Sequence, residues 1–405
     1  MTLLAAAAWL ICGLLVVVVV AHLVQRWMSI DEGPVLAVGY DLLPLALFAA
    51  PPIFVAALIT GRHALAATAG LLTIYQVVHI VPRMVSDRVP RWARRAPRFQ
   101  LAVANVFVDN PTPEAAANQL VMCGAELLAI AEATPAFMDV FDAAGGKTSH
   151  PHRVLDPADT SDYAIAIASS VPLEPGSGMR RIGPLNLAVA DVQIGGVLTT
   201  IAVLNPMATV DTGGHEKWKA QIEALKSFIP DVTGPLVIAG DLNSTRFRPE
   251  FLDLLDAGLI DLIDSLGQAW KPSFSLKSVS PLGGIGWIAR LDHALGNDGI
   301  RSLRIRNLKP RGSDHLPFVI TLAVRERGTN SEDVTARGRS TSRTRPQGPR
   351  HPEECDPGRD DRRPGERTTR RAVRQLARRL YRGSRTRCRR RSRGRSAGSV
   401  RWCGS

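Results

Sequence analysis

The sequence predicts an α/β or α+β domain preceded by about three transmembrane helices, and three observations lead to that fold class. Long apolar stretches open the chain, short apolar runs alternate with loops and helical stretches from Gln100 to about Arg325, and few aliphatic residues follow Gly328. Short apolar runs between helical stretches are typical of strands in a layered core. We therefore expect a transmembrane region at 1–85, a basic linker at 86–99, a folded domain at 100–326 and a disordered Arg-rich tail at 327–405.

The apolar stretches at 3–23, 35–60 and 64–82 are the three expected membrane spans. The first contains no Asp, Glu, Lys or Arg, and it is long enough to cross ~30 Å of hydrocarbon at ~1.5 Å per residue. The second is interrupted by Asp41 and by a Pro-Pro pair, and the third is shorter. We expect an integral protein of the cell membrane.

Arginines that follow the spans bear on the side of the membrane where the domain lies. Those after the third span are Arg83, Arg88, Arg91, Arg94, Arg95 and Arg98. The positive-inside rule therefore favours a cytoplasmic domain. The segment 88–99 is either a stretch that lies on anionic headgroups or an ordinary solvated linker.

The basic character of the chain, +13 with a pI near 10.2, belongs to its tail. Residues 327–405 contain 24 Arg, no Lys and 8 Asp or Glu, so they carry about +16 and residues 1–326 sum to about −3. Net charge therefore does not indicate a nucleic-acid-binding domain. The tail is either a disordered segment that binds acidic surfaces, such as RNA, or the product of a shifted reading frame.

Five cysteines are present, and only Cys123 lies in the expected domain. A single cysteine can form neither a disulfide framework nor a cysteine metal cluster there. We expect Cys123 to be a small buried residue.

Polar groups stand at the ends of the apolar runs of the domain. They are Asn105, Glu132, Asn205, Asp241 with Asn243, and Asp292 with His293, while Asp314 with His315 stands just before the last apolar run. Any one of them is explained as well by a turn, because Asp and Asn are common turn residues. Six such positions in one domain favour a different interpretation, in which buried strands bring these groups together in one pocket at a sheet edge.

The chemistry of these groups suits phosphoryl transfer. Mg²⁺ prefers oxygen ligands and commonly takes one or two protein carboxylates, for which Glu132 and Asp314 are suitable. Asp241 could deprotonate or orient a water, and Asn243 could hold a phosphoryl oxygen without a change of charge. Asp292 and His315 could form a pair in which the carboxylate selects the tautomer of the imidazole.

The order of these residues resembles the endonuclease/exonuclease/phosphatase superfamily, which includes DNase I and the abasic-site endonucleases. The resemblance covers roughly 100–325 and is strongest at "GDLNST" (240–245) and "GSDHLP" (312–317). With three spans ahead of the domain, the chain is similar to actinobacterial membrane-anchored members related to the VanJ-type teicoplanin-resistance protein. The resemblance implies a four-layer α/β sandwich, two packed sheets flanked by helices, and it leans toward an extracytoplasmic domain.

The resemblance also implies roles for individual residues. Glu132 would be the principal ligand of Mg²⁺ or Mn²⁺, with Asn105 and Asp314 nearby. Asp241 would activate or orient the water, and Asn243 would stabilise the developing charge. His315 would contact the scissile phosphate, oriented by Asp292.

The chain departs from the family pattern at two positions. Asn205 stands where the family usually has a histidine that serves as acid for the leaving group, and an amide cannot supply a proton. General acid assistance is typically worth 10²–10⁴-fold. The strand at 163–173 also lacks the arginine common there. A replacement acid could come from His150, His152 or His215, although each is expected in a surface loop.

These observations predict a membrane-anchored, Mg²⁺-dependent phosphohydrolase that cleaves a phosphodiester or a phosphomonoester. A nuclease would need a basic groove, and the domain is near neutral, so a lipid-linked or small phosphoester is favoured over nucleic acid. The alternatives are a nuclease and a catalytically impaired membrane scaffold of the same fold. The sequence identifies no protein partner.

Overall fold

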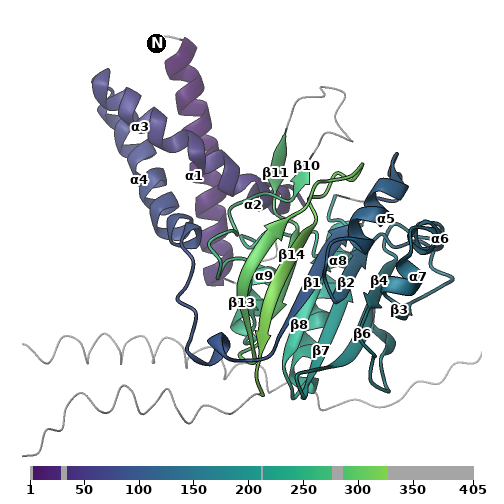
Figure 1. Ribbon diagram of the computed structural model, residues 1–405. Coiled ribbons are helices and arrows are strands. Elements are labelled where there is room, and N and C mark those ends of the chain that lie inside the picture. Colours follow the sequence, from purple (N-terminus) through teal and green to yellow (C-terminus); the bar gives the residue numbers. More distant parts are fainter. Residues whose placement is uncertain (1–2, 29–33, 211–212, 276–285, 327–405) are drawn as a thin grey trace, which may run out of the picture. The chain divides into compact units, whose positions relative to one another are not determined.

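The computed structural model describes residues 3–28, 34–210, 213–275 and 286–326 (Figure 1). The predicted Arg-rich tail at 327–405 lies outside the described residues, and its disorder stays a prediction.

The N-terminal region forms four α-helices: α1 (Leu3–Met28), α2 (Pro34–Ala46), α3 (Ala50–Ile59) and α4 (His63–His79), with a 3₁₀ turn, η1 (Leu47–Ala49), between α2 and α3. Two stretches, Leu3–Val24 and Leu36–Ile59, are long and apolar enough to cross a membrane, judged by length and composition alone. The third predicted span corresponds to α4, which has 17 residues. Buried side chains of these helices form one apolar cluster that also includes Phe247 of the domain.

The first sheet has the strand order β13-β14-β1-β2-β4-β3. Its strands are β1 (Arg98–Asn105), β2 (Leu127–Ala131), β3 (His152–Leu155), β4 (Ile165–Ser169), β13 (Ile300–Asn307) and β14 (Phe318–Val324). β1 and β2 are parallel, and β14 lies antiparallel to β1. β1 begins inside the predicted linker at 86–99. One short 3₁₀ turn, η2 (Val81–Met84), precedes the linker, and another, η3 (Trp92–Arg94), lies within it.

The second sheet has the order β5-β6-β7-β8-β12-β9. Its strands are β5 (Gly178–Ile182), β6 (Leu185–Ile194), β7 (Val197–Leu204), β8 (Leu236–Asp241), β9 (Ile260–Asp261) and β12 (Asp292–Gly296). β7 and β8 are parallel, and β12 lies antiparallel to β8. A separate pair, β10 (Phe274–Ser275) and β11 (Trp287–Ala289), completes the described strands.

The two sheets pack face to face and are covered by helices on their outer faces. One apolar cluster fills the space between the sheets, where side chains of β1, β2, β6, β7, β8 and β14 meet. A second cluster joins the outer face of the first sheet to α5 (Pro113–Val121) and α6 (Pro135–Ala143), beside the short α7 (Gly146–Ser149). A third joins the second sheet to α8 (Gly214–Phe228), the turn η4 (Ile229–Asp231) and α9 (Pro249–Asp256).

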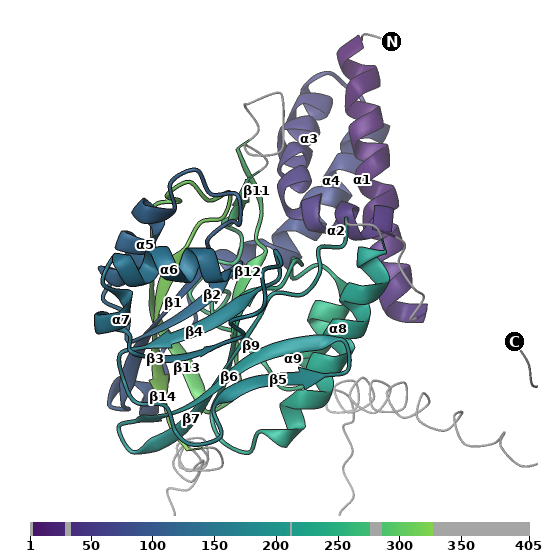
Figure 2. The same ribbon diagram turned by 90° about the vertical axis from the view of Figure 1, so that its right-hand side faces the viewer.

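Figure 2 shows α5 and α6 on one side of the sheets and α8 on the other. Because both faces of the central strands are covered, β2, β4, β8 and β12 are buried at every residue. The predicted α/β sandwich of two packed sheets flanked by helices is confirmed.

Candidate functional site

The polar groups named from the sequence gather at one edge of the two sheets. Asn105 ends β1, Glu132 directly follows β2, and Asp241 ends β8. β12 runs the other way, so Asp292 lies at its start and pairs with Asp241 across the sheet. The apolar residues before Asp292 therefore belong to a different element, since β11 ends at Ala289 and β12 begins at Asp292.

A continuous chain of contacts joins five of these side chains. The amide Nδ2 of Asn105 donates to Oε1 of Glu132 at 2.7 Å and to Oδ2 of Asp241 at 3.1 Å. Nε2 of His315 lies 3.5 Å from the same Asp241 oxygen, and its Nδ1 lies 2.8 Å from Oδ2 of Asp292. Asp314 is close to this chain, because its Oδ1 lies 4.0 Å from Nε2 of His315.

Two residues of the site adopt left-handed backbone conformations. Glu132 has a φ of 58° and Asn243 a φ of 49°. Residues other than glycine seldom adopt such values, and where they do the surrounding contacts must hold them. Glu132 is held through its carboxylate, whose Oε2 accepts a hydrogen bond of 2.7 Å from the backbone N–H of Val108. Asn243 is held from both ends, because its N–H donates to Oδ1 of Asp241 and its Nδ2 to the carbonyl of Pro206.

Burial and charge together perturb the acidities of the site. Burial raises the pKa of Glu132 to about 7, against the hydrogen bonds from Val108 and Asn105. Burial likewise raises the pKa of Asp241 to about 6, against the attraction of His315. For His315 burial alone would lower the pKa, but the charges of Asp292 and Asp241 raise it to about 10. The ring is therefore an imidazolium at neutral pH.

The donor set fits a divalent cation near Glu132 better than one bound to the imidazole. Asp241, Asp292 and His315 each have a ligand atom within 4.8 Å of the others. A protonated imidazole has no lone pair for a metal, so this trio is better explained as an imidazolium held by two carboxylates. Oδ1 of Asp292 is buried without a hydrogen-bond partner. Four carboxylates close to one imidazolium leave an excess of negative charge, which suits a hard cation with oxygen ligands.

Asn205 lies at the same sheet edge as Asp241. It follows β7, whose last residue, Leu204, pairs with Gly240 of β8. Its Nδ2 donates to the carbonyl of Asp162 at 2.9 Å, and its Oδ1 is buried without a hydrogen-bond partner. Residue 205 therefore lies at the site, but its side chain is an amide and not an imidazole.

The histidines considered as a replacement acid lie in or beside regular elements. His152 begins β3 and His215 lies buried in α8. The ring of His150 is buried between Oγ of Ser149 and the carbonyl of Ala125. The expectation of surface loops is wrong for His150 and His215, because both rings are buried.

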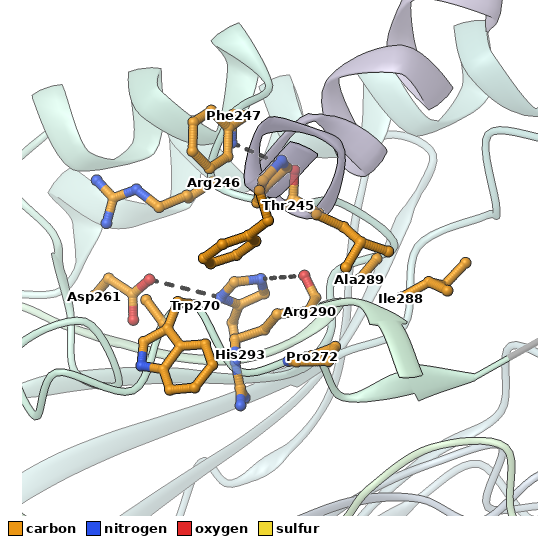
Figure 3. A pocket seen from close by; sticks show the side chains of 14 residues that line it. Thr245, Arg246, Phe247, Asp261, Trp270, Pro272, Ile288, Ala289, Arg290 and His293 are labelled. Carbon is orange, nitrogen blue, oxygen red and sulfur yellow. Dashed lines mark hydrogen bonds and ion pairs between the residues drawn. The ribbon is translucent and has the colours of Figure 1, made fainter. Parts of the chain in front are cut away.

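The loop that follows Asp241 is supported in a way that the sequence analysis missed. Nε1 of Trp218 donates to the carbonyl of Leu242 at 2.9 Å, and Nε2 of His293 lies 3.0 Å from the carbonyl of Ser244. The other ring nitrogen of His293 faces Asp261 at 3.7 Å (Figure 3). His293 thus supports the loop, a role that its position beside Asp292 in the sequence did not suggest.

A further support comes from the N-terminal helices. Asp41 of α2 accepts a hydrogen bond of 2.8 Å from the backbone N–H of Thr245 and forms an ion pair with Arg248. The signal that could have found it is the charge itself, because Asp41 is the sole Asp, Glu, Lys or Arg between residues 35 and 60.

The model of the Endonuclease/Exonuclease/phosphatase family matches residues 102–315. No curated protein matches the chain.

Solved structures that resemble the chain share little sequence with it. TDP2 from D. rerio, complexed with a single-strand DNA product, is 15% identical, with a TM-score of 0.46 over 56% of this chain and 99% of its own. Sphingomyelinase C from Streptomyces griseocarneus is 15% identical, with a TM-score of 0.41 over 56% and 99%. A double mutant of beta toxin from Staphylococcus aureus, with bound magnesium ions, is 14% identical, with a TM-score of 0.41 over 56% and 99%.

Proposed function

Because the chain belongs to the Endonuclease/Exonuclease/phosphatase family, we propose that it is a membrane-anchored, metal-dependent phosphohydrolase that cleaves a phosphodiester or a phosphomonoester by attack of water. The observation that carries the proposal is the buried chain of contacts from Glu132 through Asn105, Asp241 and His315 to Asp292. The carboxylates in this chain of contacts can bind a divalent cation. Phosphoryl transfer uses such a cation to neutralise charge on the phosphoryl oxygens.

Glu132 is the proposed principal ligand of Mg²⁺ or Mn²⁺, and Asn105, whose amide nitrogen donates to Glu132, and Asp314 are the proposed further members of the metal site. The bound cation would neutralise charge on the phosphoryl oxygens. Glu132 offers its carboxylate from a backbone conformation that Val108 and Asn105 hold in place.

Asp241 is the proposed base that orients the attacking water and accepts its proton. With a pKa of about 6, it is ionised at pH 7.5 and yet basic enough to take a proton in the transition state. Asn243 has a second N–H on its amide beyond the one that donates to Pro206, and we assign this N–H to a phosphoryl oxygen.

His315 is the proposed cationic donor to the phosphoryl group. Its Nδ1–H donates to Asp292, which fixes the ring, and its Nε2–H lies on the side of Asp241, where the water would be held. Because the imidazolium persists to about pH 10, the ring supplies positive charge throughout the neutral range.

The leaving group receives no proton from the residue at position 205. Asn205 can donate a hydrogen bond but no proton, so esters with acidic leaving groups should react best. Two features support a lipid-linked phosphoester over nucleic acid: residues 1–326 sum to about −3 in charge, and two apolar helices could hold the domain beside a bilayer. The arginines after the spans favour a cytoplasmic domain, whereas the resemblance favours the opposite side of the membrane.

The test is hydrolysis of a chromogenic bis-aryl phosphodiester and the matching monoester by the full chain in detergent, with and without Mg²⁺ or Mn²⁺. We expect metal-dependent turnover by the wild type and its loss in Asp241→Asn. Asp253→Asn is a matched control on the surface of α9, where its partner is Lys226. If a folded wild type neither turns over these esters nor binds the metals by calorimetry, the scaffold alternative is correct. Turnover of single-stranded DNA is also compared with turnover of a phospholipid in the same micelles, which tests nucleic acid against lipid as the substrate class.

A further inference from the structure

We propose that Asp41 is a positioning residue for the loop that carries Asn243, so that turnover depends on helix α2 as well as on the catalytic domain. The effect on turnover rests on the proposed function, whereas the effect on the loop does not. The loop, residues 242–248, begins directly after Asp241 and ends at α9.

Asp41 holds this loop at two points. Its Oδ1 accepts the backbone N–H of Thr245 at 2.8 Å. Nε of Arg248 contacts both carboxylate oxygens, at 3.1 and 3.0 Å, and Nη2 of Arg248 also contacts Oδ2. One carboxylate therefore joins the middle of the loop to its end.

Arg248 is buried, so water cannot take the place of the Asp41 carboxylate as its partner. Arg248 is 1% exposed, its Nη2 also donates to Oγ1 of Thr209 at 2.8 Å, and its guanidinium lies 4.7 Å from the centre of the Trp218 ring. A buried cation that loses its partner is strongly destabilised in place. Without Asp41, Arg248 would have to move toward water, and the loop would move with it.

The loop is packed between the domain and the N-terminal helices. Trp218, His293 and Pro206 support it from the domain side. On the other side Phe247 belongs to the apolar cluster of the helices, with its ring 6.5 Å from that of His22. Figure 3 shows Thr245 and Phe247 beside these helices. Asp41 supplies a charged contact on that side, and Arg246 of the loop makes another with Asp264, which also binds Arg83 just after α4.

Movement of the loop would reach the catalytic residues through the backbone. Asn243 is two residues from Thr245 and has a φ of 49°, a conformation that persists when its surroundings hold it. Its N–H donates to Oδ1 of Asp241 at 2.8 Å, so relaxation at Asn243 also releases the proposed base. Misplacement of a catalytic group by about 1 Å can cost about 10²-fold in rate.

A second docking contact explains why the helices would stay in place when Asp41 is changed. Nη1 of Arg83, just after α4, donates to Asp264 at 2.6 Å, and the backbone of Asp87 donates to the carbonyl of Ser265 at 2.9 Å. The contact of Asp87 involves no residue of the loop at 242–248, whereas Asp264 also binds Nη1 of Arg246 in that loop. Asp41→Asn should therefore alter the loop without detaching the helices.

The experiment compares the full chain in lipid nanodiscs as wild type, Asp41→Asn, Asp41→Ala and Asp41→Glu. The matched control is Asp87→Asn, which removes the ion pair between Asp87 and Arg301. The side chain of Asp87 is 60% exposed. Two readouts are taken: kcat and KM for the aryl ester, and hydrogen exchange of the backbone amides at 243–247.

We expect kcat to fall on the order of 10²-fold in Asp41→Ala and about tenfold in Asp41→Asn, which keeps an acceptor for Thr245 but not the charge for Arg248. KM should change less than about threefold, because Asp41 is proposed to act through the loop and not on the substrate. Exchange at 243–247 should speed up in both variants and stay at the wild-type rate in Asp87→Asn. Asp41→Glu, which keeps the charge, should recover most of the rate.

Unchanged exchange in Asp41→Asn, or faster exchange with unchanged kcat in an active protein, would overturn the proposal. If Asp41→Ala does not fold, Asp41→Asn and Asp41→Glu decide the question. An inactive wild type would count against the proposed function, and exchange at 243–247 would still show whether Asp41 holds the loop.

Discussion

Nδ1 of His315 lies 2.8 Å from Oδ2 of Asp292, and Nε2 of the same ring lies 3.5 Å from Oδ2 of Asp241. One imidazole thus bridges two carboxylates that face each other across the antiparallel strands β8 and β12. This bridge raises the pKa of the ring to about 10, although burial opposes it. The ring is fixed, charged and close to the proposed base.

Asp292→Asn should lower the pKa of His315 toward its ordinary ~6.5. Activity of the variant would then be lost as pH rises through about 7 to 8, where the wild type retains its imidazolium, and at pH 8 the loss should be on the order of 10²-fold. The pH–rate profiles of both proteins check this. Profiles with the same alkaline limb would contradict the assigned role of Asp292.

The same shift has a consequence for stability. A histidine with a raised pKa contributes stability that is fully present below its unfolded-state pKa of ~6.5 and is lost as pH rises to about 10. The melting temperature of the wild type should therefore fall between pH 7 and pH 10, and Asp292→Asn should fall less over that range. Calorimetry at several pH values measures both slopes.

Metal affinity should depend on pH through Glu132. Its carboxyl must lose a proton to bind the cation, and its pKa is raised to about 7. Below that pH the apparent affinity for Mg²⁺ should fall about tenfold per unit, and above it the affinity should level off. Calorimetric titration from pH 5.5 to 8 tests this. Glu132→Gln should bind weakly at every pH, and an unchanged slope in this variant would exclude Glu132 as the ligand.

Asn205→His should raise turnover of esters with poor leaving groups if the missing acid limits the reaction. The gain should approach 10²-fold for an alkyl ester and be small for an aryl ester, because only the alkoxide needs a proton as it leaves. A series of leaving groups provides the internal control. An equal rate for wild type and variant on the alkyl ester would mean that another group already supplies the proton.

Gly240→Ala should destabilise the protein by more than ~1 kcal/mol. Gly240 has a φ of 136°, and a Cβ there would lie 2.1 Å from the carbonyl oxygen of Leu204 on the neighbouring strand. The melting temperature should fall by several degrees, with loss of turnover because Asp241 is the next residue. Gly178→Ala is the control, since a Cβ there meets no atom within 4 Å. Equal melting temperatures for the two variants would contradict the close packing of β7 on β8.

Much of the candidate site could be predicted because its signal is local. Apolar runs end at Asn105, Glu132 and Asp241, and these are the points at which buried strands leave the core. Convergence of Asp292 and His315 was also expected, and the structure brings them into contact. The roles assigned to these residues stay predictions.

Other features depended on contacts between segments far apart in the chain. The contact of Asp41 with Thr245 spans 204 residues, and no periodicity or motif encodes such a distance. The role of His293 depends in the same way on Asp261 and on the carbonyl of Ser244. The sequence identified His293 as part of a motif but could not say which way its ring points.

By itself the sequence determined which chemical groups stand at the strand ends, which stretches are apolar enough for a membrane, and where the α/β domain lies, because each of these follows from composition and short-range pattern. Only the tertiary structure decided the acidities of Glu132, Asp241 and His315, since desolvation and neighbouring charge depend on what surrounds a group in space. The tertiary structure also decided that the loop after Asp241 is held by Asp41, because a buried ion pair forms only when packing brings its two partners together.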